Sequence, residues 1–174
     1  MGLDISAFSQ VEFIEVVPDS DVWEEKYDDN NGLVTEIITG LQDFPERLLP
    51  LFAPLEGFAV YRVYGEIHEF RVGSFTYYNE WRKQLSVLVT RMEPEEIWKR
   101  RKEPSIQQLP FYELIDFSDC EGSIGPAMAQ KLAQDFMAHQ LYIEQRTDAD
   151  FQEVYADFRK AFTIASNNGI VTFH

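Results

Sequence analysis

Two hydrophobic periodicities alternate along this chain, and their order constrains the fold more than any other feature. Residues 3–9 alternate apolar and polar side chains, which is typical of a half-buried β-strand, and residues 170–173 read as a strand at the other end. Between them, apolar residues recur at helical spacing in three long segments. The order along the chain is strands, then a strand–helix unit, then strand–helix–helix–strand, which predicts a sheet with helices packed on it.

This order predicts the α+β class: a single domain over residues 1–174, with a mixed or mostly antiparallel sheet and three main helices packed on it. A chain of 174 residues fits one domain with an ordinary core. We expect residues 11–17 to continue the first strand or pair with it, and residues 67–72 to pair with residues 58–64 through a tight turn. Residues 111–117 carry apolar side chains on both faces, which predicts a central strand.

The helices are predicted from their caps and their apolar stripes. Ser74 is a natural N-cap for a helix that runs to about Val89, and Pro126 suits the first turn of a second helix. Residues 147–150 offer caps for a third, which ends at residues 167–169. A shorter helix is expected to begin near residues 93–96.

Two segments are predicted to be exposed excursions, residues 19–32 and residues 91–110. The first is charged and ends in a turn signal; its acids could hold a cation, but their spacing lacks the pattern of a calcium loop. The second contains the basic run 99–102, which could bind phosphate or an acidic partner. Plain solvated chain is the favoured interpretation of both.

The formal net charge is −15, and residues 1–60 hold 13 of the acids but only 2 of the bases. Such a surface repels phosphate backbones, so nucleic acid is an unlikely partner, whereas a basic protein or a cation would suit it. Simple solubility is the favoured explanation of the charge. Cys120 is the single cysteine, no apolar run reaches membrane-spanning length, and no secretory signal is visible. We therefore expect a cytoplasmic protein with no membrane partner.

Residues 117–126 form the strongest candidate site, because they place two carboxylates, the cysteine, two hydroxyls and two glycines between a predicted strand and a predicted helix. Residues 70–79 make a similar strand-to-helix turn. If both turns lie at one sheet edge, they share a pocket. The candidate ligand-binding residues are Arg71, Ser74, Tyr77, Tyr78, Asp119, Cys120, Glu121 and Ser123. The carboxylates suit hydroxyls, an amine or a cation better than an anion.

Catalysis at this turn is less well supported. Cys120 as a nucleophile needs a base, and His68, His139 and His174 are all distant in sequence. A lone cysteine is more often a small buried residue. Asp119 and Glu121 can instead stabilise the turn and cap the following helix. No spacing supports a metal site, so we predict no catalytic residue, no metal and no cofactor.

Three segments resemble a family of uncharacterised proteins from bacteria and their phages. They are residues 1–5, residues 70–75 leading to 78–82, and residues 117–122 leading to Gly125 and to Lys131 and Leu132. The resemblance as a whole covers about half of the chain. The resemblance implies a bacterial or viral cytosolic origin, and it brings no activity and no catalytic residues with it.

Three hypotheses of function follow. The favoured one is a non-enzymatic, acidic binding protein that acts on a host protein or a small polar metabolite through a pocket between the two turns. The second is a small hydrolase or transferase that uses Asp119, Cys120 or Glu121. In the third, the turn only stabilises the fold, and the function lies on another surface.

Overall fold

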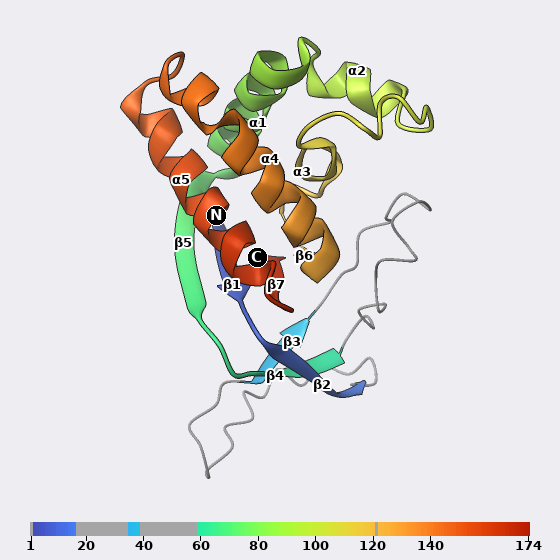
Figure 1. Cartoon of the computed structure of the whole chain (residues 1–174), viewed down its shortest axis with the longest axis vertical. Coiled ribbons are helices and arrows are strands. Elements are labelled where there is room, and N and C mark those ends of the chain that lie inside the picture. The colour runs from blue at the N-terminus through green and yellow to red at the C-terminus, as the bar shows by residue number, and fades with distance from the viewer. Residues whose placement is uncertain (1, 17–34, 39–58, 121) are drawn as a thin grey trace.

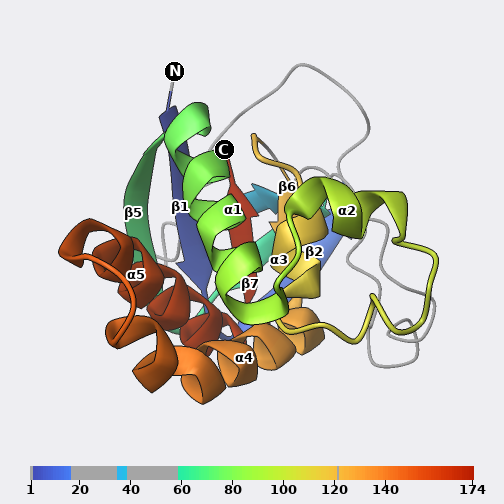
Figure 2. The ribbon, with the colours of Figure 1, turned by 90° about the horizontal axis from the view of Figure 1, so that it is seen from above.

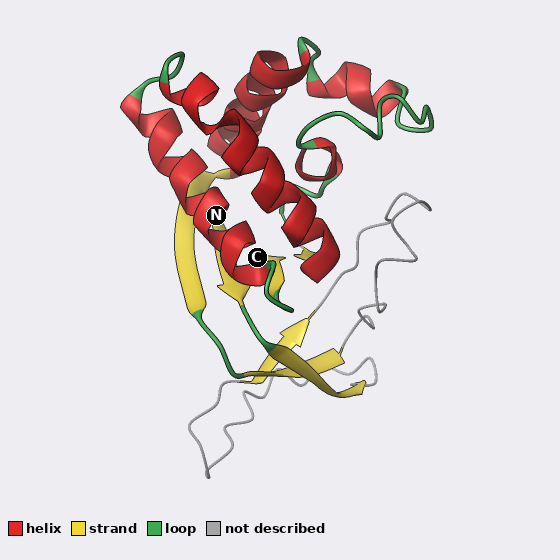
Figure 3. Ribbon diagram, in the orientation of Figure 1, coloured by secondary structure: helices red, strands yellow, loops and turns green. Residues whose placement is uncertain are grey.

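The computed structural model describes residues 2–16, 35–38, 59–120 and 122–174. In these residues the chain forms a single-domain α+β fold with two antiparallel sheets, which confirms the predicted class (Figure 1, Figure 3). The predicted loop over residues 19–32 lies outside the described residues. In the described part of the chain, no helix has both the length and the apolar character needed to cross a membrane.

The larger sheet has four strands in the order β5-β1-β7-β6. β1 (Gly2–Phe8) pairs with β5 (Ile67–Ser74) on one side and with β7 (Ile170–Phe173) on the other, and β6 (Gly122–Ile124) pairs with β7. Leu3, Ile5 and Ala7 alternate into the core. The strands predicted near the two ends of the chain are therefore confirmed, and they are direct neighbours.

The smaller sheet has the order β2-β4-β3, made by β2 (Val11–Val16), β4 (Ala59–Val63) and β3 (Thr35–Ile38). β1 leads into β2 through a bend at Gln10, whose φ of 52° lies in the left-handed region. The bend between β4 and β5 lies beside it, because the Gly65 amide donates to the Ser9 carbonyl at 3.2 Å. The predicted hairpin of residues 58–64 with 67–72 is therefore wrong: these two strands follow one another along the β1–β2 segment and pair with it.

Three main helices pack on the larger sheet: α1 (Phe75–Thr90), α4 (Pro126–Glu144) and α5 (Ala149–Ala165) (Figure 2). Their buried residues join Leu3 and Ile5 in one core cluster. The Ser74 hydroxyl accepts a hydrogen bond from the Tyr77 amide at 3.1 Å and caps α1. Asp148 caps α5 in the same way, so the predicted helix starts are confirmed.

Aromatic packing fixes α1 against α5. The fully buried Phe158 of α5 stacks on Trp81 of α1 with ring centroids 5.1 Å apart, and it also meets Tyr78 at 5.8 Å. The indole N–H of Trp81 donates to the Phe151 carbonyl at 3.2 Å. Tyr78 and Trp81 thus belong to the core, and the opposite face of α1 is left for other contacts.

Residues 111–117 are not a strand, which corrects the prediction. They contain the short helix α3 (Tyr112–Asp116), which begins after Phe111 at a φ of 58°. Tyr112, Glu113, Leu114 and Ile115 are all buried, because α3 is enclosed on every side. Its apolar pattern consequently matched that of a buried strand.

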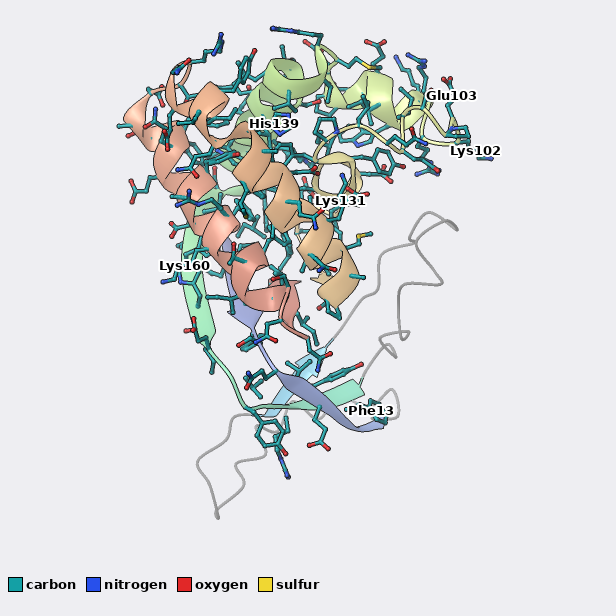
Figure 4. The ribbon with its side chains drawn as sticks, in the orientation of Figure 1. Phe13, Lys102, Glu103, Lys131, His139 and Lys160 are labelled. Carbon is teal, nitrogen blue, oxygen red and sulfur yellow. The ribbon has the colours of Figure 1, made fainter. Side chains whose placement is uncertain are left out.

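The expected short helix is α2 (Pro94–Lys99). Residues 100–105 after it are exposed, and Lys102 and Glu103 lie at the outer end of this segment (Figure 4). Ile97 and Ile106, in contrast, are buried in the core cluster, so the segment 91–110 is attached to the domain on both sides of its exposed part. This attachment positions α2 opposite α1.

Candidate functional site

A cleft of about 540 Å³ opens between α1, α2 and the loop 117–120. Its walls are made by polar and charged side chains of α1, by α2, and by the residues that follow α2 and α3. The lining residues are Asn79, Glu80, Arg82 and Lys83 from α1, Pro94, Glu95 and Trp98 from α2, and Arg101, Asp116, Phe117, Ser118 and Asp119. Figure 2 shows α1, α2 and α3 together on this side of the molecule.

Arg82 forms the floor of the cleft. Its side chain is only 3% exposed, and it lies between the rings of Tyr78 and Trp98, with centroid distances of 5.1 and 5.6 Å. Its guanidinium donates to the Phe117 carbonyl at 2.6 Å and to the Asn79 side-chain oxygen. A buried arginine held between two rings and a backbone carbonyl ties α1 rigidly to the start of the loop.

Asp119 is held by the same network. The Asn79 side-chain amide donates to Asp119 Oδ2 at 2.6 Å while its oxygen accepts from Arg82. Asn79 thus orients the Asp119 carboxylate at the cleft wall. Two segments that are 40 residues apart in sequence meet here.

Asp116 supplies a second carboxylate, at the end of α3. The Tyr112 hydroxyl donates to Asp116 Oδ2 at 3.2 Å. Burial raises the pKa of Asp116 above its ordinary value of 3.8, and this outweighs the opposite effects of the Tyr112 hydrogen bond and of the positive charges of Arg101 and Arg82. The ionised carboxylate is therefore incompletely solvated, and a cation that reached it would gain interaction energy.

Trp98 forms the aromatic wall. Its indole N–H donates to the Ile115 carbonyl at 3.0 Å, which fixes the ring, and 36% of the residue is exposed. A fixed and partly exposed indole offers a π surface to a cation or a planar group. Chemically, the cleft combines the carboxylates of Glu80, Glu95, Asp116 and Asp119 with the bases Lys83 and Arg101 and the Trp98 ring, over the buried guanidinium of Arg82.

The eight residues proposed from sequence lie in different environments. Asp119 lines the cleft. Tyr78 lies beneath it as a fully buried core residue, and burial raises its pKa to about 12. Ser74 is engaged as the cap of α1, and Tyr77 lies on the outer side of that helix with 40% exposure. Neither is among the lining residues of the cleft.

Arg71 lies on the sheet, where its guanidinium is 3.7 Å from the Asp4 carboxylate and 64% of the side chain is exposed. Ser123 is fully buried in β6, with its hydroxyl 3.2 Å from that of Thr172. The Ser123 hydroxyl therefore serves the sheet. Both residues are engaged in pairs between neighbouring strands.

Cys120 is exposed, which corrects the expectation of a buried cysteine. Its amide donates to the Ser118 hydroxyl at 3.3 Å in a local turn. Glu121 lies outside the described residues. The predicted strand-to-helix turn is in fact a helix-to-strand connection, because α3 precedes it and β6 follows it.

The histidines are all engaged away from this cleft. His68 lies 3.5 Å from Asp157, His139 contacts the Asp135 carbonyl on α4 at 3.0 Å, and His174 contacts the Ser6 hydroxyl at 2.9 Å (Figure 4 labels His139). Among the described residues, no group of three or more His, Cys, Asp or Glu side chains is arranged to hold a metal.

Sequence reasoning proposed neither Arg82 nor Trp98 as a site residue. A signal for Arg82 was available: it lies four residues after Tyr78 on a helix whose stripe is otherwise apolar, and a charge at such a position needs partners in the fold. Trp98 precedes the basic run, in a segment that was predicted only as exposed chain.

Comparison with known proteins gives no relative: no family model, curated protein or solved structure matches the chain. The resemblance to bacterial and phage proteins stays a prediction.

Proposed function

We propose that this chain is a non-enzymatic binding protein, and that the cleft between α1, α2 and the loop 117–120 accepts a cationic group of its ligand. The observation that carries the proposal is the convergence of Asp116 and Asp119 beside the exposed face of Trp98. The wider class is the one expected from sequence: an acidic cytoplasmic protein, of phage or prophage origin, that acts on a host protein or a small polar metabolite.

The side chains that line the cleft carry a formal net charge of −1, from four acids and three bases. Arg82 is engaged with Phe117 and Asn79, and Lys83 is paired with Glu93 at 3.2 Å. The acids that line the cleft are Glu80, Glu95, Asp116 and Asp119. These four acids outnumber the three lining bases, Arg82, Lys83 and Arg101, by one, so an amine or guanidinium is favoured over an anion.

Binding is favoured over catalysis by the composition of the walls. The hydrolase or transferase hypothesis needs a histidine or another base within reach of Asp119, Cys120 or Glu121. Among the described residues that line the cleft there is no histidine, and Cys120 is not a lining residue. Asp119 is engaged as a hydrogen-bond acceptor from Asn79, which suits a fixed recognition group. Trp98 adds a surface for cation–π contact.

The test is calorimetric titration with arginine amide and with citrulline amide, which has the same shape without the charge. We expect arginine amide to bind and citrulline amide to bind at least tenfold more weakly. Asp119→Asn should weaken arginine amide by about ten- to a hundredfold, because one charge-assisted contact is lost while the acceptor for Asn79 is kept. Asp150→Asn, at an exposed position of α5, is the matched control and should have no effect.

Equal affinity for the two amides would refute cation recognition. An Asp119→Asn variant that binds arginine amide as tightly as the parent would show that this cleft is not the binding site.

A further inference from the structure

A second hollow of about 450 Å³ adjoins the cleft along α1. Glu80 and Lys83 line both spaces, so the two share a wall on this helix. The second hollow differs in character, because Val87 and Leu88 of α1 contribute to its wall and Val87 is 37% exposed. A polar cleft and a partly apolar hollow therefore adjoin each other on neighbouring faces of α1.

The ridge between them is formed by Glu80 and Lys83, which line both spaces, and Lys83 pairs with Glu93 of the second hollow at 3.2 Å. Both side chains of this pair are about half exposed. An exposed ion pair contributes little to stability and can rearrange to meet a ligand. Its amine and carboxylate offer a donor and an acceptor to groups that cross the ridge.

We propose that the cleft and the second hollow form one groove that binds an extended peptide segment of a partner protein. A basic side chain of the segment enters the cleft, and an apolar side chain enters the second hollow. This inference rests on the proposed function, since the cleft supplies the first anchor.

The length of the groove sets the spacing of the two side chains. The α1 residues of the cleft centre near position 81 and those of the second hollow near position 84, which is about 5 Å along a helix that rises 1.5 Å per residue. The two sets also lie about a quarter turn apart around the helix, which at a radius of about 5–6 Å places the two openings about 9 Å apart. A polyproline-type segment advances about 3.1 Å per residue and repeats its side-chain direction every third residue. The basic and the apolar residue are therefore three positions apart, with two residues between them.

Charge decides between a partner protein and a second copy of this chain. The net charge of −15 makes two copies repel each other, whereas a segment with a basic residue is attracted to the four acids of the cleft. A small metabolite would occupy the cleft alone and leave Val87 uncovered. A basic peptide segment fits both the charge and the length of the groove.

The test uses acetylated, amidated peptides with one arginine and one leucine in an alanine background, separated by none to five residues and made in both orders. NMR titration should give the tightest binding at two intervening residues. Replacing the leucine by serine should weaken this peptide about tenfold or more, as expected for an apolar side chain that leaves the hollow.

Two surface variants locate the leucine contact. Val87→Gln should abolish the preference for leucine over serine, whereas Met137→Gln, at a 66% exposed position of α4, should preserve it. If arginine amide binds but the leucine or its spacing has no effect, the peptide inference is wrong and the proposed function stands. If arginine and Asp119 are also without effect, both fail. Concentration-dependent dimerisation that Val87→Gln removes would assign the groove to a second copy and overturn the inference.

Discussion

Replacement of Arg82 by methionine should destabilise the protein, because Arg82 holds the cleft together. The variant keeps the length of the side chain but removes its hydrogen bonds to the Phe117 carbonyl and to Asn79. A buried acceptor left without a donor costs about 1–3 kcal/mol, and the loss of two cation–π contacts adds about 1 kcal/mol. Removing the desolvation penalty of a buried charge offsets part of this.

The net expectation is a loss of about 2–3 kcal/mol, or a fall of about 4–12 °C in Tm for a domain of this size. Arg82→Lys keeps the charge but reaches fewer acceptors, so its loss should be about half as large. Urea denaturation gives the free energy of unfolding, and hydrogen exchange at residues 117–120 should become faster in the methionine variant. A methionine variant as stable as the parent, with unchanged exchange in this loop, would refute the assigned role of Arg82.

Three further predictions concern the charges and the packing of the fold. Lys131→Met leaves the buried Glu113 without its cation and should cost about 3 kcal/mol at pH 7. Burial already raises the pKa of Glu113, so this carboxyl takes up a proton more readily in the folded state than in the unfolded chain. The loss of stability should therefore shrink as the pH falls from 7 toward 5, and an equal loss at both pH values would contradict this. The raised pKa of Asp116 means that this carboxylate takes up a proton at a higher pH than an ordinary aspartate does. Affinity for arginine amide should therefore begin to fall at a pH above 3.8, and calorimetry of Asp116→Asn should show that this part of the fall is removed. Gly169→Ala should destabilise by about 1–3 kcal/mol in thermal denaturation, since its Cβ would lie 2.8 Å from the Ala165 Cα and against the Phe8 carbonyl; unchanged Tm would refute that close packing.

Features that depend on local physics could be predicted from the sequence. The start of α1 follows from the hydroxyl of Ser74, and the start of α4 from the fixed φ of Pro126. The strand near each end follows from alternation or from β-branched and aromatic residues. Each signal lies within a few residues of the element that it specifies.

Features that depend on distant contacts could not be predicted. The four residues Tyr112 to Ile115 of α3 are all buried by other elements, so this helix has no amphipathic period that the sequence could show. The pairing of β5 with β1 depends on the bends at Gln10 and Gly65 lying side by side, which joins segments about 60 residues apart. Periodicity contains no information on such pairing.

The candidate site contains residues that could be predicted from the sequence and residues that could not. Asp119 was found because the polar residues of 117–126 stand out in an apolar context. Arg82 and Trp98 were not found, because one lies in a core stripe and the other lies before a basic run. Only the close approach of α1, α2 and the loop 117–120 makes them neighbours.

The central claim is that the cleft beside Trp98 binds a cationic group, and the indole N–H resonances of the protein test it most directly. Titration with arginine amide should shift the Trp98 indole resonance and the amides of residues 117–120. The Trp81 indole should stay unchanged, because it is buried and bonded to Phe151. Trp98→Phe identifies the resonance. If the Trp98 signal does not move, or if Trp81 moves as much, the assignment of this cleft as the binding site is wrong.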